Sequence, residues 1–296
     1  MPTLRDVIDR LTEERLDIGR SFIATLEYSV SHFEKHNRGI LDVTEITAKH
    51  IRAMMRGLLD EPRSVRTVNN NRWNIFYLLE CCRQFGMTGP REPFTFRDVK
   101  KMKEPERAPT AWSEDQFCKI IEHCLKAPER RGWGPAHWYA LYMTIYDSSL
   151  RIGCLMKSKV SQLSAAENTL YIPGELQKGK RDTIQSIDPD TAKRVLWLPR
   201  EEGDDRLFPW PYCRSQIWHF LVEDILKPAG LPYSRRDMFH KVRRTSYTLV
   251  YREFGLEAAS AHASHKQDLS RFYLDKSLLN RPNPLDALPR PIPKIK

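Results

Sequence analysis

Apolar residues recur at intervals of three and four through the first third of the chain, which is the spacing of an amphipathic helix. The clearest segments are residues 20–36, 43–60 and 64–86, and Gly86 supplies a natural C-terminal stop for the last of them. Each segment carries its apolar residues on one stripe, as a helix does when one side packs against a core. Residues 1–105 are therefore expected to form a helical domain.

The pattern changes at residues 88–111, which contain four prolines and a cluster of three lysines. Proline and charge at this density favour a linker. A second domain is expected over residues 112–280, and Ser113 with Gln116 fits a capping box at the start of its first helix. The tail, residues 281–296, has five prolines in sixteen positions and is expected to be extended.

The second domain mixes helical and strand patterns. Residues 134–149 are so apolar that the helix they predict must lie in the core, and residues 168–187 predict two short strands around a basic turn. Helical spacing returns in residues 189–197, 214–227 and 238–254, the last closed by Gly255. The predicted fold is mainly α with a small β-hairpin or sheet: a helical domain followed by an α+β domain.

The composition of the chain indicates what kind of partner it binds. Of 296 residues, 48 are Lys or Arg and 38 are Asp or Glu, which gives a formal net charge of +10. Such an excess favours a partner built of phosphates. No stretch approaches the ~18 consecutive apolar residues of a membrane-spanning helix, and the N-terminus lacks the apolar segment of a secretory signal. Nucleic acid is therefore favoured over a membrane.

The cysteines and histidines do not predict a metal site. Six cysteines are scattered without C-x-x-C spacing, which is typical of a protein from a reduced compartment. His262 and His265 stand three positions apart, but no second ligand pair at metal spacing accompanies them. We therefore expect no metal and no other cofactor.

The stretch "FHKVRRTSY", residues 239–247, raises the first question of chemistry. His240 and Arg243 are three apart, so on a helix they share a face, and Asp237 is expected to cap that helix. Two cationic hydrogen-bonding groups side by side suit a phosphate. Taken alone, an ordinary solvated helix face is the more frequent explanation for such a pair.

The neighbouring segments resemble the tyrosine recombinases, the phage-integrase family. "YDSSLRIGCLMKSKVSQL" is similar to that family's arginine-bearing segment and puts Arg151 at the arginine. "LQKGKRDTIQSI" resembles its lysine hairpin, with Lys178 at the lysine position and Lys180 as an alternative. "HKVR" matches its H-x-x-R box.

"AHASHKQDLSRFYLD" resembles the closing segment of the family, with His265 at the second histidine and Tyr273 at the nucleophile. The resemblance covers about residues 15–280 and implies a helical core-binding domain followed by the catalytic domain. The implied protein is a site-specific DNA recombinase or integrase of bacterial, phage or mobile-element type, cytoplasmic and nucleoid-associated. Its implied partners are double-stranded DNA and further copies of itself, in a tetramer on paired sites.

The resemblance also implies a role for each residue. DNA would be cleaved and rejoined through a covalent 3′-phosphotyrosine, without metal or ATP. Tyr273 would be the nucleophile, His240 the proton acceptor and Lys178 the general acid for the leaving 5′ oxygen; Arg151, Arg243 and His265 would stabilise the phosphate. The bases expected to contact DNA are Lys49, Arg52, Arg56, Arg66, Arg72, Lys100, Lys101 and Lys180.

Three departures from the family pattern leave alternatives open. Cys154 replaces the usual glutamate, Ala263–Ser264 replaces Leu-Gly, and the interval from His265 to the tyrosine is one residue short. Tyr247 and Tyr251 are the alternative nucleophiles. The alternative functions are a type IB topoisomerase-like enzyme and a DNA-binding protein with a degraded recombinase site.

Overall fold

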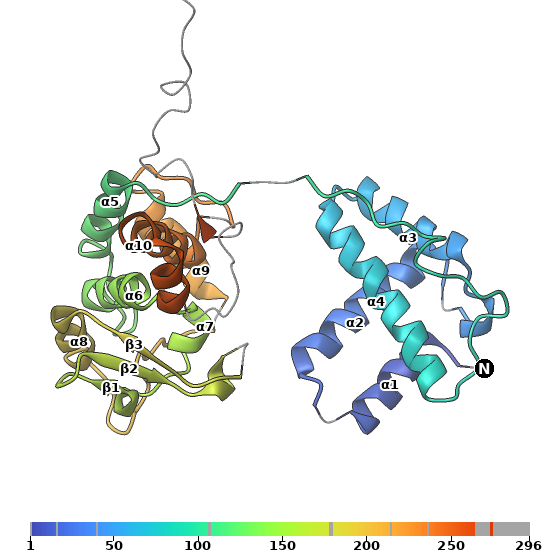
Figure 1. The fold of residues 1–296 in the computed structure, drawn as a ribbon, viewed down its shortest axis with the longest axis horizontal. Helices are drawn as coiled ribbons and strands as arrows, with labels where there is room; N and C mark the ends of the chain where they lie inside the picture. Colours follow the sequence, from blue (N-terminus) through green and yellow to red (C-terminus); the bar gives the residue numbers. More distant parts are fainter. Residues whose placement is uncertain are drawn as a thin grey trace, which may run out of the picture. The chain divides into compact units, whose positions relative to one another are not determined.

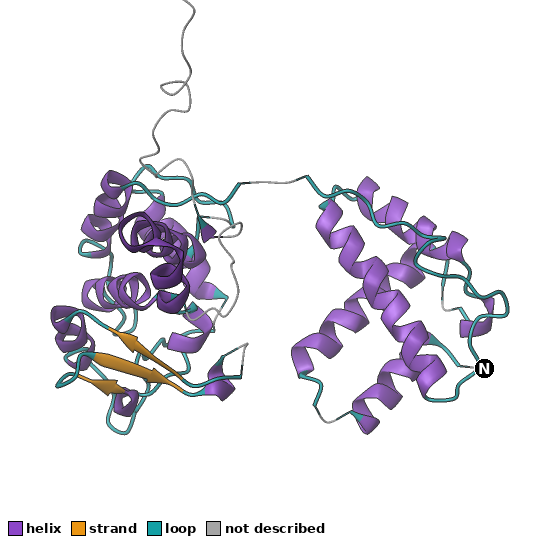
Figure 2. Ribbon diagram, in the orientation of Figure 1, coloured by secondary structure: helices purple, strands orange, loops and turns teal. Residues whose placement is uncertain are grey.

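The computed structural model describes residues 2–15, 17–39, 41–105, 108–177, 180–213, 215–235, 237–263 and 273–274. The chain divides into two compact units, Met1–Glu106 and Arg107–Lys296. Helices dominate both, and the second unit also contains one small antiparallel sheet (Figures 1 and 2). The predicted fold class is confirmed. No helix in the described ranges is both long and apolar enough to cross a bilayer.

The first unit is a bundle of four helices. They are α1 (Leu4–Glu14), α2 (Arg20–His36), α3 (Ala48–Asp60) and α4 (Val65–Gln84), with a short 3-10 turn, η1 (Val43–Glu45), before α3. Their apolar stripes meet in a core that includes Leu11, Leu26, Val30, Ile51, Leu58 and Ile75, all fully buried or nearly so. Burial of these stripes, rather than helix propensity alone, stabilises the bundle.

The prediction of one continuous helix over residues 43–60 is wrong, because this segment forms η1 and α3. The chain is extended at Thr47, which begins α3 as its N-cap. The Thr47 backbone N–H donates to His50 Nδ1 at 3.1 Å, closing a capping box. A capping residue inside a periodic pattern starts a new helix at that point.

The linker expected over residues 88–111 is too long. Phe94, Val99 and Met102 pack against the core of the first unit, and Arg52 donates to the Asp98 carbonyl at 2.9 Å. Proline and charge correctly indicated a segment without a helix. Three apolar side chains, spaced too widely to show a period, fix most of that segment to the bundle.

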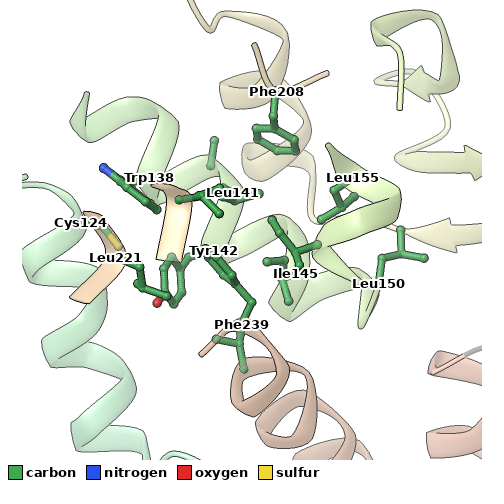
Figure 3. Packing of buried hydrophobic residues seen from close by; sticks show 14 of the residues in the cluster. Cys124, Trp138, Leu141, Tyr142, Ile145, Leu150, Leu155, Phe208, Leu221 and Phe239 are labelled. Atoms are coloured by element: carbon green, nitrogen blue, oxygen red, sulfur yellow. The ribbon is translucent and has the colours of Figure 1, made fainter. Parts of the chain in front are cut away.

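The second unit is built around α6 (Pro135–Ser148). This helix contacts α5 (Glu114–Cys124), α8 (Pro189–Leu196), α10 (Phe239–His262) and the sheet. Leu141, Tyr142 and Ile145 on α6 belong to one buried cluster with Leu155, Phe208, Leu221 and Phe239 (Figure 3). The remaining elements are α7 (Ile152–Leu155), α9 (Gln216–Leu221), the π-helical turn η4 (Val222–Leu226) and the 3-10 turns η2 (Val160–Gln162) and η3 (Gly174–Leu176).

The sheet has the order β1-β2-β3, formed by Leu163–Ser164, Thr169–Ile172 and Thr183–Ser186. The predicted hairpin is β2 and β3, paired antiparallel with Leu170 opposite Gln185. The two-residue strand β1 was not predicted, because two residues carry no alternation to recognise. Gly174 follows β2, and a Cβ there would lie 2.7 Å from the Arg181 nitrogen, so only glycine lets the two arms approach.

Gly255 ends the helical run that begins at Phe239, as expected, because its backbone is non-helical, with φ 82° and ψ −172°. A further helical segment, which was not expected, follows it to His262, so α10 consists of two helices joined at a kink. The helical segment beyond it carries Ala259 against Tyr247, Ala263, Tyr273 and Leu274 in a small second cluster.

Candidate active site

Arg151 is held by the turn between α6 and α7. Ser149 ends α6 in the left-handed region, with φ 51°, and Arg151 follows as the N-cap of α7. Its carbonyl accepts the Cys154 N–H at 2.8 Å, and the residues on either side, Leu150 and Ile152, are buried. Two buried neighbours fix this turn in the core and leave the half-buried Arg151 side chain between them.

Helix α10 brings His240 and Arg243 to the same place. Ser246 Oγ donates to the Tyr146 carbonyl at 2.5 Å, and this bond ties α10 to the last turn of α6, just before Arg151. The expected cap of this helix is wrong: Met238 is the N-cap, whereas Asp237 accepts from Ser234 and from Lys241 Nζ at 3.0 Å. The ion pair of Asp237 and Lys241 stabilises the start of the helix, and packing on α6 positions the helix.

Arg243 is the most buried cation of the site, with 2% of its surface exposed. Its Nη2 donates to the Ala263 carbonyl at 3.0 Å, and its guanidinium lies 5.4 Å from the ring centre of Tyr273, with which it also shares a side-chain hydrogen bond. Burial and, to a smaller extent, the nearby charge of Arg151 lower the pKa of Arg243 to about 10. Arg243 is still charged at neutral pH, so its buried charge and that of the half-buried Arg151 repel each other, and an anion bound between them would be stabilising.

Tyr273 lies against this pair. It is 5% exposed, and its ring centre is 5.4 Å from that of His240 and 5.6 Å from that of Tyr247. Its carbonyl accepts from Thr248 Oγ1 at 3.3 Å. Tyr273 thus meets both members of the H-x-x-R box and stays the first choice of nucleophile, whereas Tyr247 is fully buried.

The structure brings together four of the six predicted catalytic residues: Arg151, His240, Arg243 and Tyr273. Lys178 and His265 lie outside the described residues. Two described residues just before them contact the site through their carbonyl groups. The Leu176 carbonyl, two positions before Lys178, accepts from Cys154 Sγ at 3.1 Å. The Ala263 carbonyl, two positions before His265, accepts from Arg243. Lys180, the alternative lysine, is exposed in a turn with φ 47°.

Two further residues of this centre were missed as site residues. Cys154 is 3% exposed, and burial raises the pKa of its thiol, so the group that replaces the family's glutamate is a neutral donor. His262 Nε2 lies 2.5 Å from Ser246 Oγ, and burial together with the charge of Arg243 lowers the pKa of His262 to about 4. In the sequence, the spacing of His262 and His265 in "HASH" suggests a metal-ligand pair and gives no sign of the contact with Ser246.

Because the pKa of His262 is lowered, we expect the second unit to lose stability in mild acid. Its pKa falls from an ordinary 6.5 to about 4 on folding, so the unfolded chain binds the proton first as the pH drops below 6.5. We expect unfolding free energy to decrease by about 2 kcal/mol at most between pH 6.5 and 5, and His262→Gln to remove that part of the decrease. Urea unfolding at several pH values measures this, with His123→Gln, at a partly exposed histidine, as the control. Equal pH dependence of all three chains would contradict the prediction.

The residues of the first unit that were predicted to contact DNA differ in their exposure to solvent. Lys49, Arg52 and Arg56 are exposed on α3, and Arg66, Lys100 and Lys101 are exposed as well. The prediction that Arg72 contacts DNA is wrong. Arg72 is 5% exposed and donates to the carbonyls of Val99 at 2.6 Å and Phe96 at 3.0 Å. Its charge serves to hold the following segment and is not available to a phosphate.

Solved structures resemble this chain over most of its length. A lambda integrase dimer bound to a COC′ core site matches with a TM-score of 0.68 at 17% identity, covering 91% of this chain and 76% of that one. XerH recombinase bound to palindromic difH substrate gives 0.65 at 16% identity, covering 88% and 77%. The Tn1549 transposon integrase in complex with transposon right end DNA gives 0.63 at 12% identity, covering 90% and 92%.

Sequence comparison alone finds no such likeness, since no protein-family model and no curated protein matches the chain. At identities this low, the structural agreement concerns the fold. The order of motifs and the fold agree with each other, and the chain therefore has the fold of the tyrosine recombinases, as its motifs predicted.

Proposed function

We propose that this protein is a site-specific DNA recombinase that cleaves and rejoins DNA through a covalent link to Tyr273. The observation that carries the proposal is the pair of the half-buried Arg151 and the buried Arg243, with the Tyr273 ring beside them. Two like charges partly removed from water are unfavourable unless an anion or hydrogen-bond acceptor compensates them. A phosphodiester supplies both the charge and the acceptors.

The chemistry follows from these groups. The Tyr273 oxygen would bond to phosphorus while the bond from phosphorus to the 5′ oxygen breaks. His240 would take the tyrosine proton, and Lys178 would give a proton to the leaving oxygen. The arginine forks would hold the non-bridging oxygens, where negative charge grows in the transition state. The phosphotyrosine conserves the bond energy, so the reverse attack by a 5′ hydroxyl rejoins DNA.

The solved neighbours support the partners we propose. One lambda integrase structure is a tetramer bound to a Holliday junction, and XerH was captured with its substrate after cleavage. For this chain we propose the same class of partner, double-stranded DNA, and assembly as a tetramer on paired sites. The net charge of +10 and the exposed bases of α3 suit that partner.

The test is covalent trapping. Duplexes that the full chain binds are first selected from a random library, and nicks are then placed along the selected site so that a short strand is lost after cleavage. A protease-sensitive protein–DNA adduct on a denaturing gel is the expected result. Specific binding with no adduct at any nick would favour the degraded site, and relaxation of plasmids that lack the site would favour the topoisomerase.

Replacing an exposed basic residue of the first unit should weaken DNA binding, whereas replacing the buried Arg72 should lower stability. Arg56→Ala is expected to lower the slope of log affinity against log salt by roughly 0.9, the loss of one phosphate contact. Arg72→Ala is expected to lower stability by about 1–3 kcal/mol, because two backbone carbonyls lose a charged donor. Fluorescence anisotropy and urea unfolding measure these. A slope reduced by Arg72→Ala in a folded chain, with Arg56→Ala neutral, would contradict the placement of both residues.

A further inference from the structure

The first unit holds a cluster of potential ligands that DNA cleavage does not use. His32 and His36 lie four apart on α2, and Glu61 is the C-cap residue of α3. One ligand atom from each of the three lies within 4.8 Å of the others. His36 Nε2 is 3.2 Å from Glu61 Oε1, and His32 Nδ1 is 3.9 Å from Glu61 Oε2.

The histidine nitrogens facing Glu61 lack hydrogen bonds. His32 Nδ1 and His36 Nε2 are both buried, and neither makes a hydrogen bond within the described ranges. His32 is only 8% exposed. A buried polar nitrogen without a hydrogen bond is costly unless something else satisfies it. Two such nitrogens converging on one carboxylate are arranged as ligands of a cation.

The position of His36 is built into α3. A Cβ on Gly57 would lie 2.0 Å from His36 Nδ1, so any other residue at 57 would displace the ring. Glycine inside a helix costs about 1 kcal/mol relative to alanine. Here it admits the imidazole against the helix backbone, and the rings of His32 and His36 lie nearly parallel, with an interplanar angle of 10°. Both ligands on α2 are thus placed by rigid elements.

We propose that His32, His36 and Glu61 bind a zinc-class divalent cation, with water completing its coordination. Two imidazoles and one carboxylate are a ligand set that Zn²⁺ accepts, at bond lengths of about 2.0–2.2 Å. Tetrahedral bonds of that length put ligand atoms about 3.3 Å apart, so the side chains need shifts on the order of 1 Å. The ion would join α2 to α3, the helix with the exposed bases, and would stabilise the first unit.

Two exposed cations now compete for the carboxylate. Lys35 Nζ lies 2.5 Å from Glu61 Oε1, and Arg63 Nε lies 3.5 Å from Glu61 Oε2. Both side chains can leave Glu61 for water when an ion binds. The sequence pattern contained the H-x-x-x-H pair of α2, but the third ligand follows 25 positions later on another helix, and no spacing rule connects them.

The test uses the full chain without DNA, so its outcome is independent of the proposed recombination. After dialysis against a chelator, the chain is titrated with Zn²⁺ in competition with a chromogenic indicator. One saturable site per chain and a raised melting temperature are expected. Glu61→Gln and His36→Gln should each weaken binding by at least about tenfold. His123→Gln, which alters a partly exposed histidine of the second unit, should leave Zn²⁺ binding unchanged.

Lys35→Met distinguishes the site from a simple ion pair, because removing the competing ammonium should tighten Zn²⁺ binding. This variant also covers the case in which a histidine variant fails to fold, which circular dichroism in chelator would reveal. Co²⁺ should give visible absorption of tetrahedral intensity that Glu61→Gln abolishes. No saturable site, or a site unaffected by both Glu61→Gln and Lys35→Met, would overturn the proposal.

Discussion

Tyr273→Phe is expected to abolish the covalent protein–DNA adduct while DNA affinity stays close to that of the unchanged chain. The variant loses only the hydroxyl oxygen. Its ring can still pack against His240 and Tyr247 and beneath the Arg243 guanidinium. Adduct formation on the nicked duplex and anisotropy on the intact duplex measure the two properties separately.

Matched controls come from the neighbouring tyrosines. Tyr251→Phe removes a hydroxyl from a partly buried ring that packs on the same small cluster as Tyr273. Tyr247→Phe does so from a fully buried ring of that cluster. Both variants should form the adduct at rates close to those of the unchanged chain. An adduct that survives Tyr273→Phe but disappears in either control would reassign the nucleophile.

The helices of this fold were predictable wherever one strong apolar stripe decides the structure. The expected segments 20–36 and 134–149 agree with α2 and α6 to within one residue at each end. Prediction failed where a single residue overrides the period, as at Thr47, which starts a new helix, and it did not foresee the helical segment that follows the break at Gly255. Such residues act through local backbone geometry, to which a periodicity argument is blind.

The candidate site was predictable from the order of motifs, not from periodicity. Arg151, His240, Arg243 and Tyr273 come from three separate segments, and only resemblance to a known arrangement joined them. Contacts between distant segments stayed hidden, such as that of Cys154 with the Leu176 carbonyl. Arg72 shows the opposite error, because a count of charges cannot tell a buried arginine that binds carbonyls from an exposed one that meets phosphate.

Arg243→Lys is expected to reduce the cleavage rate by roughly 10²-fold or more, the scale of losing one donor to a developing oxyanion. Lysine keeps a charge but has no planar fork, so it cannot donate two parallel hydrogen bonds to a phosphate. It also inherits the burial and the adjacent Arg151 charge that lower the pKa of Arg243 to about 10. Because an ammonium is easier to deprotonate than a guanidinium, the same surroundings should bring a lysine pKa toward neutrality.

Arg243→Lys should therefore show a pH dependence that the unchanged chain lacks. The lysine is charged below its pKa, so the deficit relative to the unchanged chain should shrink as pH falls from 8 toward 6 and grow as pH rises. Single-turnover cleavage of the nicked duplex at each pH, reported as the ratio of the two rates, cancels every pH dependence common to both chains. Arg244→Lys is the matched control, because the next residue points about 100° around the helix. A larger loss from Arg244→Lys than from Arg243→Lys would show that Arg244, and not Arg243, holds the phosphate.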